Sequence, residues 1–213
     1  MPWPVTHILI AEAFYAPYFS HLDHQQFIVG NSFPDIRYPA KIDRHLTHFR
    51  AISMEELQTA TPFRAGVMFH SVVDGLWNEI LLRDNAALFA VIPHDKIMIH
   101  TMKVLQDKYL YERREDWEKI SGYFSKIILE ELDYGVEGSM VKRWHQVLGN
   151  YLRKPPQIED LEMLKASLPL EMVENIRIYY QRFCNVPLLK EHLVRFCESA
   201  QTKMLDFSLN KRF

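Results

Sequence analysis

Glycine is scarce in this chain, with 7 residues among 213. That is about half of the share usual in soluble proteins, and neither G-x-G-x-x-G nor G-x-x-x-x-G-K-[ST] occurs. Those two motifs form glycine-rich loops whose backbone cradles phosphates. The sequence therefore argues against a dinucleotide-binding or P-loop enzyme.

Cysteine is scarce too, and the two present, Cys184 and Cys197, form no C-x-x-C motif. Such a pair is typical of reduced thiols and predicts a cytoplasmic protein. The first basic residue is Arg37, so the amino-terminal segment lacks the basic region of a signal peptide. The apolar stretch 8–19 contains Glu12 and is too short to span a membrane. We therefore expect no transmembrane segment.

Neither charge sign dominates, because 25 Lys and Arg oppose 27 Asp and Glu. This balance argues against broad binding to nucleic acid. Apolar residues make up 48% of the chain, which is long enough to bury a core without disulfides. We predict a single domain over residues 1–213, with Pro155-Pro156 as the candidate hinge between subdomains. The oligomeric state stays open.

Alternating strand patterns are lacking, and helical spacing of apolar residues predicts an all-α bundle of about nine helices. Thr61 followed by Pro62 is a helix-start signal, and the apolar helix that it opens, to about residue 83, should be central. Ser53 and Glu56 form a capping-box signature, and Asp23 would cap a short helix that ends near residue 30. The segment 31–43 reads as a loop. The longer expected helices are 5–15, 62–83, 93–112, 115–132, 139–152, 157–167, 170–183 and 188–206.

Histidine, in contrast, is plentiful, and six of the ten lie in the first 70 residues. Histidine-rich segments support metal binding or acid–base chemistry. Chance variation in composition would also account for this number of histidines. The six are His7, His21, His24, His45, His48 and His70.

His70 and Asp74 carry the clearest local signal, because they are four residues apart in the expected central helix. Their side chains lie about 40° apart on one face, so both can reach one metal ion. A carboxylate in an apolar helix needs a partner, and a metal held by a neutral imidazole would be one. The alternative is a His–Asp hydrogen bond that ties two helices together.

Three weaker signals precede this helix. Asp35 follows Pro34 on an expected rigid loop, where it would serve as a ligand or as a turn cap. His48 lies in a Thr-His-Phe run, and His7 lies on the first helix. Each histidine alone would be interpreted as a core residue with a hydrogen bond.

The order of these four motifs along the chain is more specific than any one of them alone. A histidine on the first helix precedes G-x-x-x-P-D at residues 30–35, then Thr-His-Phe, then G-x-x-x-H-x-x-x-D at residues 66–74. Over about residues 5–80 this order resembles the zinc-dependent phospholipase C family, which shares its all-α fold with the S1/P1 nucleases. The resemblance implies zinc-dependent hydrolysis of phosphoesters.

The resemblance also implies a ligand set. Asp35, His48, His70 and Asp74 match the ligands of one metal site, and His7 matches a ligand of a neighbouring metal that Asp74 would bridge. The family adds a His a few residues beyond the Asp that matches Asp74, and then a later His-x-x-x-Glu pair, and this sequence has neither. We therefore expect one or two Zn²⁺ ions, with Mn²⁺ or Fe²⁺ also suited to these ligands.

The expected chemistry follows from such a centre. A bound divalent ion would activate water at neutral pH, and Asp35 or Asp74 would orient that water as the catalytic carboxylates. The substrate would be a small phosphoester or a phospholipid. Asn78 follows Asp74 by four residues and would contact a ligand rather than the metal. Glu79 lies about 140° around the helix from Asp74, so we do not expect it to act as a base. His21, His24 and His45 would contact phosphate or, more typically, cap or face the surface.

Two other functions remain open. An HD-type phosphohydrolase would use His94-Asp95 with His70 upstream, but Pro93 puts that dipeptide at a helix start, where capping explains Asp95. A non-catalytic helical protein would have a structural metal or none, and four protein ligands can close a tetrahedral site.

Overall fold

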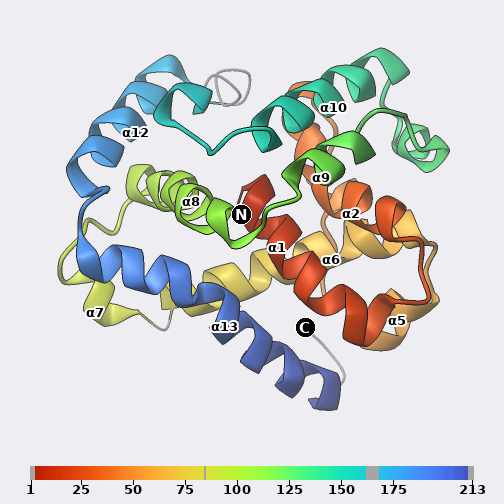
Figure 1. The fold of residues 1–213 in the computed structure, drawn as a ribbon, viewed down its shortest axis with the longest axis horizontal. Helices are drawn as coiled ribbons and strands as arrows, with labels where there is room; N and C mark the ends of the chain where they lie inside the picture. Colours follow the sequence, from red (N-terminus) through yellow and green to blue (C-terminus); the bar gives the residue numbers. More distant parts are fainter. Residues whose placement is uncertain (1–2, 84, 162–167, 211–213) are drawn as a thin grey trace.

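Helices make up the architecture of residues 3–83, 85–161 and 168–210, which the computed structural model describes and in which no strand occurs (Figure 1). The all-α prediction is therefore confirmed. The α-helices are α1 (Pro4–Phe14), α2 (His24–Ser32), α3 (Arg37–Ala40), α4 (Arg44–Thr47), α5 (Met54–Thr59), α6 (Pro62–Trp77), α7 (Ala86–Phe89), α8 (Lys96–Leu110), α9 (Trp117–Tyr123), α10 (Gly138–Leu152), α12 (Leu170–Phe183) and α13 (Pro187–Asn210). The 3₁₀ segments are η2 (Pro34–Ile36), η4 (Tyr111–Arg113), η5 (Leu129–Tyr134) and η6 (Ile158–Leu161), and the π-helical segments are η1 (Tyr15–Phe19) and η3 (Asn78–Arg83).

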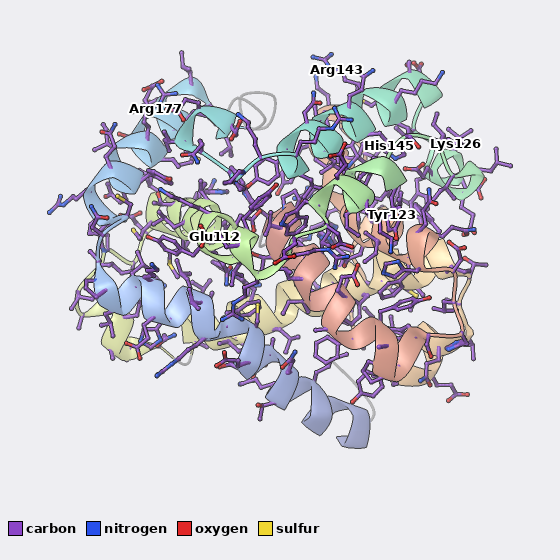
Figure 2. All side chains as sticks on the ribbon, viewed as in Figure 1. Glu112, Tyr123, Lys126, Arg143, His145 and Arg177 are labelled. Carbon is purple, nitrogen blue, oxygen red and sulfur yellow. The ribbon has the colours of Figure 1, made fainter. Side chains whose placement is uncertain are left out.

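The described residues form twelve α-helices rather than about nine, partly because predicted long helices divide. The predicted helix 115–132 is α9 followed, after a turn, by η5. Within η5, the fully buried Glu131 accepts a hydrogen bond from the Ile128 backbone (2.7 Å) and lies 2.8 Å from His145 on α10. Figure 2 marks His145 where α9 and α10 meet. Satisfying this buried carboxylate outweighs local helix propensity.

The predicted loop 31–43 is wrong, since α2 continues to Ser32 and is followed by η2 and α3. Its two prolines occupy early helical positions, Pro34 at the start of η2 and Pro39 in the short α3. A proline there removes an N–H that has no helical acceptor, so it does not prevent a helix. Lys41, with φ of 55°, ends α3.

Helix-start signals in the sequence match the structure well. Ser53 and Glu56 make the predicted capping box of α5, and Asp23 accepts from the Gln26 backbone at the start of α2. The Thr61 hydroxyl caps α6, which continues through π-helical η3 to Arg83, close to its predicted end.

Close backbone contact joins α2 to α6. A Cβ built on Gly66 would lie 2.1 Å from the Phe27 carbonyl oxygen and 2.7 Å from the Asn31 nitrogen. On the facing helix, a Cβ on Gly30 would lie 2.1 Å from the Phe63 carbonyl oxygen. Only glycine permits this approach, so both glycines set the distance between the two helices.

Helix α1 lies in the interior and packs against α2, α6, α8 and α13 (Figure 1). Its amino terminus is capped from α8, because the Asp107 carboxylate accepts hydrogen bonds from the Val5 and Thr6 backbones and from the Thr6 hydroxyl. A carboxylate at this end satisfies unpaired N–H groups and complements the helix dipole. Asp107 therefore fixes the position of α1 and of His7 on it.

One cluster of buried apolar side chains includes residues on both sides of Pro155-Pro156, such as Tyr151 and Val173. The hinge at this point stays a prediction. Among the described helices, none combines the length and apolar character that crossing a membrane requires.

Candidate metal centre

Five predicted ligands come from four separate parts of the fold. His7 lies on α1, Asp35 lies in η2, His48 follows the last residue of α4, and α6 carries His70 and Asp74. The structure brings all of them into one cluster. Ligand atoms of His7, His70 and Asp74 lie within 4.8 Å of one another, and so do those of Asp35, His48 and His70.

Asp74 is at the centre of this cluster. Its carboxylate oxygens lie 3.6 Å from Nε2 of His7, 3.6 Å from Nε2 of His48 and 3.8 Å from Nε2 of His70. These separations are too long for hydrogen bonds. Two ligands about 2.1 Å from a tetrahedral zinc are roughly 3.4 Å apart. The spacing therefore matches ligands that share a cation better than a His–Asp hydrogen bond.

The His70 ring is oriented by the backbone of α2. Its Nδ1 lies 2.9 Å from the Asn31 carbonyl oxygen, and because a carbonyl only accepts, Nδ1 carries the proton. The Nε2 lone pair then points toward Asp74. Such a bond from the second ring nitrogen is the usual support of a metal-binding histidine. The Asn31 side chain also donates to the His7 carbonyl oxygen (3.0 Å).

The His48 ring is oriented by its neighbour. The fully buried Thr47 hydroxyl donates to the Pro34 carbonyl oxygen (3.4 Å), and its oxygen lies 2.9 Å from His48 Nδ1. Nδ1 therefore donates to Thr47, and Nε2 keeps its lone pair. Downstream, the Phe49 backbone donates to the Ser71 hydroxyl on α6 (3.0 Å), which holds this segment beside the central helix.

Several polar atoms of the cluster are buried without a hydrogen bond in the described part of the chain. They include Nε2 of His48, Nε2 of His70 and Oδ1 of Asp35. Leaving a buried polar atom unpaired costs roughly 1–3 kcal/mol. A divalent cation would satisfy all three atoms at once, so these residues fit a metal ion on the chemistry of their donors.

Burial prepares the histidines to bind a cation. Burial, aided by nearby His70, lowers the pKa of His7 to about 4 and that of His48 to about 3. Burial also lowers the pKa of His70. For Asp74, burial acts to raise the pKa, but the neighbouring His70 and His7 outweigh it and the pKa is lowered. At neutral pH the cluster therefore offers neutral imidazoles and an ionised Asp74.

Asp35 behaves differently, since burial and the charge of Asp74 raise its pKa to about 6. Protons therefore compete with the metal for Asp35 below pH 6, whereas His7 and His48 start to compete only near pH 4. We expect metal affinity to fall roughly tenfold between pH 7 and pH 5. Titration calorimetry with Zn²⁺ at several pH values measures this. Three histidines of ordinary pKa would instead give a fall of roughly ten-thousand-fold over the same interval, which would contradict the proposed protonation states.

Replacing Thr47 tests the support of His48. Thr47→Val keeps the shape of the side chain but removes the oxygen that accepts from His48 Nδ1. We expect zinc affinity to fall by about 10–100-fold, measured by competition with a chelator of known affinity. Thr47→Ser is the matched control, because it keeps the hydroxyl and should bind zinc like the natural protein. Equal affinity in the valine variant would show that the ring needs no such support.

The secondary candidates lie elsewhere and have other partners. His21 bonds the Gln58 carbonyl oxygen, and His45 pairs with Asp43 at the surface. His24 lies between Glu12 and the Tyr123 hydroxyl. Asn78 is exposed, and Glu79 pairs with Lys203 on α13.

The dipeptide expected for an HD-type site does not join the cluster either. His94 stacks on Phe89, with ring centroids 4.0 Å apart. Asp95 caps α8 by accepting from the Met98 backbone (2.8 Å), as its position after Pro93 indicated, and accepts from the Tyr179 hydroxyl. Both residues therefore have structural roles.

Sequence reasoning did not assign roles to Asn31, Thr47 or Asp107. Asn31 and Thr47 lie inside the motifs that contain Asp35 and His48, so their proximity was a signal, but which atoms they contact depends on the fold. Asp107 lies about a hundred residues from the helix that it caps.

Comparison with protein-family models, with curated proteins and with solved structures found no match for this chain. The resemblance to the zinc-dependent phospholipases C stays a prediction that rests on the order of the motifs.

Proposed function

We propose that this protein is a metal-dependent hydrolase of phosphoesters. The observation that carries the proposal is the position of Asp74, within 3.6–3.8 Å of Nε2 on three histidines, with Asp35 in the same cluster. Zn²⁺ is the proposed metal, as one or two ions, and Mn²⁺ or Fe²⁺ suits the same nitrogen and oxygen donors.

The five clustered residues would have different roles in the reaction. When bound, a divalent ion supplies a Lewis acid and lowers the pKa of a water molecule. His7, His48, His70 and the two carboxylates would hold the ion or ions. Asp35 or Asp74 would also orient the attacking water and accept its proton. That proton passes to the leaving oxygen as the new P–O bond forms and the ester P–O bond breaks.

A metal measurement followed by a substrate panel tests this proposal. Purified protein is analysed for Zn, Mn and Fe, stripped with a chelator and reloaded. It is then assayed on a phosphomonoester, a phosphodiester and phosphatidylcholine. We expect stoichiometric metal, hydrolysis of at least one substrate, and loss of that activity on stripping with recovery on reloading. Metal-free protein that cannot be loaded contradicts the proposal.

The low exposure of the cluster favours a second candidate, a structural metal. The side chains of His7, His48, His70 and Asp74 are only 2–7% exposed, and structural zinc sites are closed by protein ligands. A helical protein with such an ion would hydrolyse nothing and would lose stability on stripping. For either candidate we propose a cytoplasmic location, since both cysteines are free thiols.

A further inference from the structure

A cavity of about 610 Å³ lies between α9, the turn that follows it and α10. This volume is in the range of small-molecule binding sites. Gly122 of α9 and Gly149 of α10 line the cavity, and a Cβ built on Gly122 would meet nothing within 4 Å. The lining residues include none of the five residues of the metal cluster. The fold therefore offers a second place where a small ligand fits.

Buried hydrogen bonds fix the walls of this cavity. The Ser121 hydroxyl on α9 donates to the Gly149 carbonyl oxygen on α10 (3.0 Å). His145 also lines the cavity, and its Nε2 lies 2.8 Å from the buried carboxylate of Glu131. These contacts join α10 to α9 and to η5. Because they are made within the protein, the cavity is formed before any ligand enters, as is usual for small-molecule sites.

The charged side chains that line the cavity are all positive. They are Lys126, Lys142 and Arg153, and among the described residues no Asp or Glu lines it. None of these three cations has an ion pair or a hydrogen bond within residues 3–83, 85–161 and 168–210. Lys154, in contrast, pairs with Asp160 (2.8 Å). Three cations around one cavity match a ligand with more than one negative charge.

Phosphate groups suit this lining. A phosphate attached through one ester bond has a charge of about −1.5 to −2 at pH 7. The guanidinium of Arg153 presents paired N–H donors that fit phosphate oxygens, and a lysine binds phosphate as a point charge. Phe124 and Ile127 line the same cavity, so the rest of the ligand would meet apolar surface. Nucleic-acid-binding domains instead carry an extended basic face and a strongly basic charge, whereas this chain has a net charge of −2.

We propose that the cavity between α9 and α10 binds a small molecule in which a phosphate is attached to an apolar group. Lys142 and Arg153 would contact the phosphate, and Phe124 and Ile127 would contact the apolar group. This site needs no metal ion, so it does not depend on the proposed function.

Three probes test the site by separating charge from shape. Phenylphosphonate has two negative charges at pH 8 and no ester bond that could be hydrolysed. Benzenesulfonate has the same ring but one negative charge, and methylphosphonate has the charge without the ring. Each probe is titrated by calorimetry into the full chain after metal removal, because a phosphonate would also contact a metal ion in the cluster.

The variants are Lys142→Gln and Arg153→Gln, which change exposed residues. Arg143→Gln is the matched control, because Arg143 is an exposed arginine on α10 (Figure 2) that is not among the residues that line the cavity. Lys126 is not replaced, because it also borders a smaller hollow that two carboxylates line. Melting temperatures are measured for every variant.

We expect phenylphosphonate to bind at least about tenfold more tightly than benzenesulfonate, because of its second charge, and than methylphosphonate, because of its ring. Lys142→Gln and Arg153→Gln should each weaken phenylphosphonate binding about tenfold and leave the melting temperature unchanged. Arg143→Gln should change neither. Lys142→Arg keeps the charge and should retain most of the affinity.

Four outcomes would overturn this site. Equal affinity for phenylphosphonate and benzenesulfonate, or an Arg143 variant as impaired as the Arg153 variant, would show general attraction to the basic face of α10. The absence of measurable phenylphosphonate binding to the metal-free chain at millimolar concentration also contradicts the site. A single-stranded oligonucleotide that displaces phenylphosphonate and binds more tightly would assign the surface to nucleic acid. Protein that cannot be loaded with metal contradicts only the proposed function, since these titrations use the metal-free chain.

Discussion

Replacing His70 with alanine is expected to lower zinc affinity by more than a hundredfold and to abolish phosphoester hydrolysis. The variant removes one of three imidazoles around Asp74 and the one that the Asn31 carbonyl orients. The fold should survive, because alanine is the best helix former, although the vacated buried space costs about 2–3 kcal/mol. Metal content, melting temperature and hydrolysis are measured beside the natural protein.

The control for this experiment is His21→Ala. His21 is exposed, and its one hydrogen bond in the described part of the chain joins it to the Gln58 carbonyl oxygen. This variant should keep full metal content and activity. The same measurements separate a catalytic from a structural metal. If stripping the natural protein lowers its melting temperature sharply, if the loaded protein hydrolyses no substrate, and if His70→Ala is equally unstable, the metal is structural.

Gly66→Ala is expected to lower the free energy of unfolding by about 3 kcal/mol or more. Helix propensity alone would favour alanine by about 1 kcal/mol. The added Cβ, however, would lie 2.1 Å from the Phe27 carbonyl oxygen, so α2 must move away from α6. That movement would also take the Asn31 carbonyl away from His70 Nδ1. Zinc affinity should therefore fall together with stability. Denaturation measures the stability, and competition with a chelator measures the zinc affinity.

Gly122→Ala is the matched control, because it is also a helical glycine but a Cβ there meets nothing within 4 Å. It should leave stability unchanged or raise it by up to about 1 kcal/mol. If Gly66→Ala is as stable as Gly122→Ala, the two helices can separate at little cost and their glycines do not position the site.

Local signals in the sequence predicted helix starts and the central helix. Ser53, Thr61 and Asp23 cap helices as expected because the groups involved lie within one turn of each other. The helix 170–183 is found at its predicted bounds. One error occurs where groups far apart in the chain decide the structure. The helix predicted through residue 132 ends early, where Glu131 bonds His145 on another helix.

For the candidate site, the sequence by itself determined which side chains are available and that His70 and Asp74 share a helix face, since helical geometry follows from spacing alone. Only the tertiary structure decided that His7 and His48 also reach Asp74. The Asp107 cap and the Asn31 side chain of α2 position α1, and the Ser71 hydroxyl of α6 holds the segment that follows His48. Those contacts join residues far apart in the chain. Their geometry depends on how whole helices pack, which no local pattern specifies.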